Sequence, residues 1–237
     1  ETISKRNCIA KGQNKQLIRF FSNFTRASFS RGCLPISSIL INVFINFPGT
    51  VSTHVVLIFV FILGGWLLIS SIVFDTAAPN QMTVVPSYRG INTSQMVLTK
   101  GAVKELRSHL GFTQIRFHCS KHSGHIFHVA TAANSTGEAV VQYFSGQTDV
   151  QPDACGSFVR MDNDNSILSR QCHQWGWENG TYKVGKWGHS RDQDRLYIYP
   201  AFVYHAQHWH TSPDGTRHCD DGGSGKTAGD FWKIYVR

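Results

Sequence analysis

The sequence predicts an α+β protein: a mostly antiparallel β-sheet domain with one N-terminal helix, preceded by a single transmembrane helix. Three observations lead to this prediction. An uninterrupted apolar run covers residues 55–74, apolar residues near helical spacing follow in residues 96–110, and short alternating segments begin at residue 112. The region after the apolar run is long enough, at about 150 residues, for one sizeable hydrophobic core.

The apolar run at residues 55–74 predicts a helix that spans a membrane as a signal-anchor. Its 20 residues carry no charge, and at about 1.5 Å per residue they match a hydrocarbon core of about 30 Å. Seven basic residues and one acidic residue precede it, whereas 16 basic and 14 acidic residues follow it. The positive-inside rule therefore predicts a single-pass type II protein of the cell membrane with an extracellular C-terminal domain. A cleaved signal peptide, and hence secretion, is the alternative.

The chain accordingly divides into four parts. Residues 1–54 are expected to be a basic, disordered segment on the cytosolic side, and residues 55–74 to contact membrane lipid. Residues 75–90 contain two prolines and are expected to form a stalk. Residues 91–237 are expected to form the disulfide-bonded extracellular domain.

Local patterns place the elements of that domain. Asn92, Thr93 and Ser94 offer N-caps for the helix, and Gly111 ends it. Beyond Gly111 the spacing becomes strand-like. The strand candidates are residues 112–119, 125–131, 138–144, 195–199, 201–210 and 230–236.

Cysteines and glycosylation motifs support the extracellular assignment. The domain holds four cysteines, an even number that predicts two disulfides with three pairings open. They are Cys119, Cys155, Cys172 and Cys219. Three Asn-x-Ser/Thr triplets predict N-glycosylation. They begin at Asn92, Asn134 and Asn179.

Two groups of acidic residues are candidate calcium ligands. Asp and Asn alternate over residues 162–165, and further acids precede the Gly-rich stretch at residues 222–225. Ca²⁺ takes about six to eight oxygen ligands, and such loops supply some of them. Asx turns at loop tips are the alternative interpretation. The candidate ligands are Asp162, Asp164, Asp220 and Asp221.

The histidines of the domain form two groups, for which a surface or packed position is the default interpretation. On a strand, His208 and His210 would share one face and suit two metal ligands. However, no His-Glu-x-x-His, Cys-x-x-Cys or Gly-x-Ser-x-Gly motif accompanies them. The sequence therefore predicts no enzyme, with a histidine-based metal-dependent enzyme as an alternative. The groups are His118, His122, His125 and His128, and His205, His208 and His210.

From about residue 101 to residue 237 the chain resembles a cnidarian family of extracellular proteins that includes uncharacterised skeletal organic matrix proteins of corals. The resemblance rests on short motifs that together hold all four cysteines. They are residues 111–119, 154–158, 162–169 before Cys172, 186–189 (Lys-Trp-Gly-His), 219–221 (Cys-Asp-Asp) and 229–237. The resemblance implies secretion or membrane display and a place in an extracellular or biomineral matrix. It implies no catalytic or ligand residue.

A second similarity concerns the segment around Cys172. The order Asp162-x-Asp164, Cys172, Trp177, Asn179-Gly and Tyr182 is similar to that of fibrinogen-related lectin domains. Those domains bind acetylated sugars and calcium. Their full Gly-Gly-Trp-Trp signature is absent from this chain.

These features predict a non-enzymatic extracellular binding or adhesion module, lectin-like and associated with the cell surface or the skeletal organic matrix. Glycans or extracellular matrix proteins are the expected partners, and a structural matrix component without glycan binding is the alternative. Nucleic acid is not an expected partner, because the 16 basic and 14 acidic residues of residues 75–237 give a net charge of only +2. The stretch 222–227 is not a nucleotide-binding loop, because Asp220 stands where the motif requires its first glycine.

Overall fold

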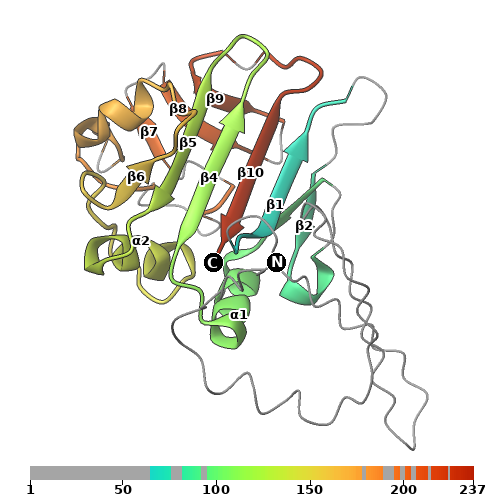
Figure 1. Ribbon diagram of the computed structural model, residues 1–237, viewed down its shortest axis with the longest axis vertical. Helices are drawn as coiled ribbons and strands as arrows, with labels where there is room; N and C mark the ends of the chain where they lie inside the picture. Colours follow the sequence, from blue (N-terminus) through green and yellow to red (C-terminus); the bar gives the residue numbers. More distant parts are fainter. Residues whose placement is uncertain are drawn as a thin grey trace, which may run out of the picture. The chain divides into compact units, whose positions relative to one another are not determined.

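The computed structural model describes residues 65–75, 82–91, 95–177, 180–188, 195–197, 201–203, 207–212, 215–223 and 225–237. These residues form an α+β domain whose main element is a seven-stranded sheet. Its strands, in spatial order, are β2 (Thr83–Val85), β3 (Met96–Leu98), β1 (Leu67–Val73), β10 (Phe231–Val236), β4 (Ile115–Ser120), β5 (Ile126–Thr131) and β6 (Phe158–Arg160). Neighbouring strands are antiparallel except β2 and β3, which are parallel. Figure 1 shows β5, β4, β10 and β1 side by side, and the predicted mostly antiparallel sheet is confirmed.

Strand β1 corrects the prediction of a transmembrane helix at residues 55–74. It pairs with β10 from Leu67 opposite Val236 to Val73 opposite Phe231, and its residues 69–72 are buried. A strand covered on both faces is as continuously apolar as a membrane helix, so hydropathy alone does not separate the two. Residues 55–64 lie outside the described residues. Among the residues that the structure describes, no helix has the length and hydropathy needed to cross a membrane.

The segment predicted as a stalk, residues 75–90, also contributes to the fold. It contains β2 and the short 3₁₀ helix η2 (Tyr88–Gly90). The parallel pairing of β2 with β3 sets Val85 opposite Leu98. The folded domain therefore includes β1 and β2 and begins earlier in the sequence than residue 91.

The predicted helix is present as α1 (Lys100–Leu110), but it starts later than expected. Its N-cap is Thr99, whose Oγ1 accepts a hydrogen bond from the amide of Ala102 at 3.2 Å. It ends at Gly111, whose left-handed φ of 61° makes the predicted C-cap. The predicted caps at residues 92–94 lie outside the described residues.

The segment at residues 138–144 was predicted as a strand and is part of a second helix, α2 (Ser135–Phe144). Apolar residues at 140, 141, 143 and 144 fit both a strand and one face of a helix. The start of the helix decides between them, because Asn134 caps it by accepting a hydrogen bond from the amide of Gly137 at 3.0 Å. The side chain of Glu138 adds negative charge in its first turn.

A second, three-stranded antiparallel sheet has the order β7 (Ala201–Val203), β8 (Gln207–Thr211) and β9 (Arg217–Asp221). The strand predicted at residues 201–210 is therefore two antiparallel strands. Residues 195–197 lie in a turn instead of the strand predicted at residues 195–199. Strand β9 had no counterpart among the predicted strands.

One face of the large sheet packs into the hydrophobic core. The ring of Phe117 on β4 lies 5.3 Å from that of Phe144 on α2 and 5.6 Å from that of Trp209 on β8. The core also buries Trp175, Trp187 and Trp232 almost completely. Four of the five tryptophans of the last third are therefore core residues: Trp175, Trp187, Trp209 and Trp232.

Candidate functional site

The face of the sheet opposite the core carries cationic and aromatic side chains side by side. We call it the cation–aromatic face. It consists of Trp66, Arg116, His118, His128, Phe231, Lys233, Tyr235 and Arg237. Strand alternation produces it, because on β4 and β10 the residues between these positions are buried in the core.

Register brings these side chains into rows across the strands. Arg116 on β4 lies opposite Tyr235 on β10, and His118 lies opposite both Lys233 on β10 and His128 on β5. The Arg116 guanidinium carbon is 4.0 Å from the centroid of the Tyr235 ring. Each such cation–π contact is worth about 0.5–1 kcal/mol when exposed.

Trp66 extends the face beside β1. Its ring lies 4.8 Å from the guanidinium carbon of Arg116 and 4.5 Å from that of Arg237. At the other end of β10, the Lys233 ammonium lies 4.8 Å from the Phe231 ring. The face therefore presents three cations that each contact an aromatic ring, and Arg237 also donates a hydrogen bond to the side chain of Gln114.

The electrostatics of the face are those of a positive surface. Within the described part of the chain, no carboxylate forms an ion pair with Arg116 or Lys233. Burial lowers the pKa of His118 to about 3, with smaller contributions from His128, Arg116 and Lys233, so the imidazole is neutral at physiological pH. Burial also raises the pKa of Tyr235, so its hydroxyl stays neutral.

His118 and His128 form a stacked pair on this face. Their ring centroids are 3.7 Å apart with an interplanar angle of 9°. Asn163 bonds the Nδ1 of His128, and the amide of His128 donates to Asp164 at 2.8 Å. Of the first predicted histidine group, these two residues come together, whereas His122 and His125 lie in the turn between β4 and β5.

A second cluster consists of His208, His210 and His218, which we call the three-histidine cluster. One ring nitrogen of each residue lies within 4.8 Å of the others. His208 and His210 were expected to share a face of one strand. His218 was not singled out from the sequence, although the turn signal Pro213-Asp-Gly before it predicts a return strand. His205 of the same predicted group lies outside the described residues.

Burial favours the neutral form of these imidazoles. It lowers the pKa of His208 to about 3, with help from the nearby charges of His218, His210 and Lys121. It also lowers the pKa of His218, which the hydrogen bond and charge of Asp221 partly oppose. Neutral imidazole is the form that binds transition metals.

Three of the four predicted calcium ligands, Asp164, Asp220 and Asp221, bind protein donors. Each oxygen of Asp164 accepts two hydrogen bonds: Oδ1 from the His128 amide and Ser166, and Oδ2 from Ser169 and Arg160. These contacts hold the loop after β6 against β5. The fourth, Asp162, is exposed.

Asp220 and Asp221 are also structural. The Asp220 carboxylate accepts hydrogen bonds from the amides of Ile167 and Leu168, at 2.8 and 2.6 Å, ahead of the 3₁₀ helix η3 (Leu168–Arg170). Burial raises the pKa of Asp220, and these two amide hydrogen bonds oppose the rise. Asp221 pairs with the buried ammonium of Lys121. Asp164, Asp220 and Asp221 are thus bound by groups of the protein, and calcium binding by the four acids stays a prediction.

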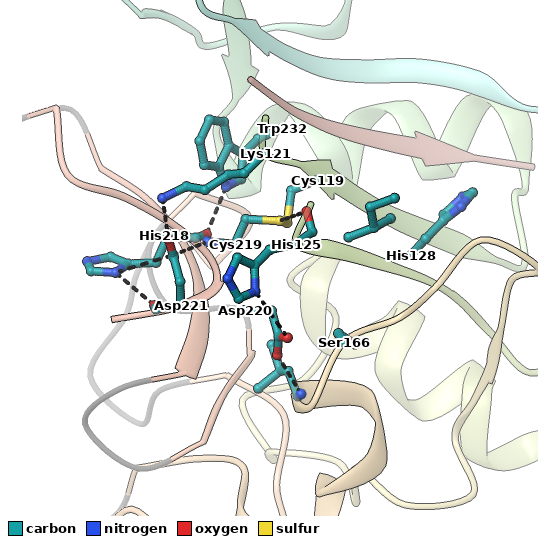
Figure 2. The surroundings of a disulfide bond; sticks show 12 residues. Cys119, Lys121, His125, His128, Ser166, His218, Cys219, Asp220, Asp221 and Trp232 are labelled. Carbon is teal, nitrogen blue, oxygen red and sulfur yellow. Dashed lines mark hydrogen bonds and ion pairs between the residues drawn. A yellow bond between two sulfur atoms is a disulfide. The ribbon is translucent and has the colours of Figure 1, made fainter. Parts of the chain in front are cut away.

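Figure 2 shows the side chain of Lys121, the residue directly after β4, with its ammonium bonded to Asp221 near the ring of His218. Its ammonium also donates to the carbonyl oxygens of Gly223 and Gly225, both at 3.0 Å. This loop therefore binds a lysine through its carbonyl groups, which is the opposite polarity from a phosphate-binding loop.

The structure resolves the disulfide pairing that the sequence left open. Cys119 on β4 bonds Cys219 on β9 and joins the two sheets, and Cys155 bonds Cys172. Figure 2 shows the first of these between the strands. Two disulfides are consistent with an extracellular domain.

Among the predicted glycosylation sites, Asn134 is exposed. Its Oδ1 accepts hydrogen bonds from the Gly137 amide and from the hydroxyl of Thr136, the third residue of the triplet. Asn92 and Asn179 lie outside the described residues. Glycosylation at the three sites stays a prediction.

The fold and its surfaces define a class of protein: a disulfide-bonded α+β domain with a positive, aromatic sheet face. Comparison with protein-family models, with curated proteins and with solved structures finds no match for this chain.

Proposed function

We propose that the protein is a non-enzymatic extracellular binding module of the cell surface or extracellular matrix, and that its cation–aromatic face binds acidic glycans. The observation that carries the proposal is the position of Arg116 and Lys233 beside aromatic rings on a sheet face where, among the described residues, no carboxylate forms an ion pair with either cation. Arginine and lysine recognise sulfate and carboxylate groups, and aromatic rings stack on the apolar faces of sugars.

Two further points support this function over its alternatives. The two disulfides suit an extracellular compartment. Because three of the four candidate calcium ligands bind protein donors, a calcium-dependent lectin is not favoured.

The test is salt-dependent binding to heparin, used as a sulfated polysaccharide, with the double variant Arg116→Gln/Lys233→Gln. The variant removes two charges of the face, and we expect its affinity to fall by about tenfold or more at low salt, where screening is weak. Binding is measured by surface plasmon resonance with the full chain.

The control is Lys104→Gln, an exposed cation on α1. It removes a positive charge outside the face. Residues 1–54, with seven basic residues and one acidic residue, are the same in both variants, so any attraction of polyanions to that segment contributes equally to the two measurements. The proposal fails if the double variant and the control bind heparin equally, or if the full chain binds no acidic glycan.

A further inference from the structure

We propose that His208, His210 and His218 bind one divalent transition-metal ion, with Zn²⁺ as the best-fitting ion. This site is separate from the cation–aromatic face and goes beyond the proposed glycan binding. Three imidazoles that leave one position open are a common ligand set for Zn²⁺.

The backbone of two paired strands brings the ligands together. His208 and His210 alternate on β8, and His210 lies directly opposite His218 on β9. Asp220, with a left-handed φ of 57°, is the extra residue of a bulge on β9 that sets His208 opposite Asp221. At this bulge, the Asp220 carboxylate points to the amides of Ile167 and Leu168. The imidazoles of His208, His210 and His218 lie together as one cluster.

The spacing of the rings suits a metal. A tetrahedral Zn²⁺ with Zn–N bonds of about 2.0–2.1 Å requires ligand nitrogens about 3.3 Å apart. The nitrogens of the cluster lie within 4.8 Å of one another, so the required shift is small. His208 is the most exposed of the three and supplies this shift by side-chain rotation.

The surroundings orient His218 as a ligand. Its Nδ1 is 3.1 Å from the carbonyl oxygen of Asp221, which only accepts hydrogen bonds. Nδ1 therefore carries the proton, and Nε2 keeps its lone pair for a metal. This is the outer-shell arrangement that metal-binding histidines commonly have.

The scaffold around His218 is held in place on both sides. The Trp232 indole donates to the His218 carbonyl at 2.8 Å, and the adjacent Cys219 is bonded to Cys119. Lys121, whose charge acts on His208 and His218, is held by Asp221 and by two loop carbonyls. The ligand positions are thus set by the fold before any metal arrives.

The experiment titrates the full chain, first treated with a chelator, with ZnSO₄ by isothermal calorimetry and with CoCl₂ by visible spectroscopy. We expect one metal ion per chain, the absorption bands of four-coordinate Co²⁺, and a higher melting temperature with Zn²⁺. His208→Gln and His218→Gln should each weaken Zn²⁺ binding at least tenfold and remove the Co²⁺ bands.

The matched control is His109→Gln, an exposed histidine of α1. It should bind both metals like the wild type. If His218→Gln does not fold, metal binding by His208→Gln, whose substituted side chain is more exposed, tests the inference. The inference is overturned if the wild type binds no stoichiometric metal, or if the cluster variants bind it as tightly as the control.

Discussion

At the scale of single residues, the polar side chains of this domain mostly serve the fold. Asp164, Asp220 and Lys121 were visible in the sequence as charged residues near loops, and two of them were read as metal ligands. Their partners include backbone amides and carbonyls that lie between about 35 and 100 residues away in the sequence, together with the charged side chains of Arg160 and Asp221. The sequence shows which side chains carry oxygen atoms, but it does not show which hydrogen-bond donors the fold brings within reach of them.

The lowered pKa of His118 gives a prediction at this scale. Unfolding restores an ordinary pKa near 6.5, whereas burial and nearby charge hold it at about 3 in the fold. Between these values the unfolded chain binds a proton that the folded chain does not, so stability falls as the pH decreases through this window. The variant His118→Phe cannot bind this proton. Its free energy of unfolding should therefore fall less steeply than that of the wild type as the pH decreases, with a difference in slope of up to about 1.4 kcal/mol per pH unit.

Urea unfolding at pH values from about 7 down to about 4 measures this slope. His122→Gln, in the exposed turn after β4, is the control and should keep the wild-type slope. An unchanged slope in His118→Phe would show that another group controls the acid sensitivity.

At the scale of elements, β1 and α2 show where local patterns mislead. Residues 67–73 are apolar because β1 lies between β3 and β10 inside the sheet. Residues 138–144 form a helix because Asn134 caps them, although their apolar positions also fit a strand. In both cases the sequence shows that the segment is apolar. Whether it forms a strand or a helix depends on the neighbouring strands for β1 and on the Asn134 cap for α2.

Ile69 tests the assignment of β1 as a core strand. Its side chain is fully buried, so Ile69→Ala should destabilise the protein by about 2–5 kcal/mol. Val73, at the exposed end of the same strand, is 37 % exposed, and Val73→Ala should cost less than about 1 kcal/mol. Denaturant unfolding compares the two variants, and equal small effects would mean that β1 is not part of the cooperative core.

At the scale of the whole molecule, the two disulfides differ in what they join. Cys119 and Cys219 are fully buried, 100 residues apart, and link the two sheets. Cys155 and Cys172 are 17 residues apart, and Cys155 is exposed. The first bond therefore constrains much more of the unfolded chain.

We expect Cys119→Ala/Cys219→Ala to lower the free energy of unfolding by about 1–2 kcal/mol more than Cys155→Ala/Cys172→Ala. Chain entropy predicts about 4.7 kcal/mol for a loop of about 100 residues and about 3 kcal/mol for one of about 15 residues. Unfolding midpoints of the two double variants, measured under the same conditions, check the order. The opposite order would show that native-state packing outweighs loop closure.

Local sequence patterns were sufficient to predict the α+β class, α1 and its glycine cap, the strands β4, β5 and β10, and the four cysteines of the domain. Alternation, capping residues and residue counts express these features locally. The place of β1, the helical state of α2, the disulfide pairing and both candidate surfaces followed only from the folded structure. Arg116 meets Tyr235, and His210 meets His218, through strand register, and register depends on packing across the sheets and not on the order of neighbouring residues.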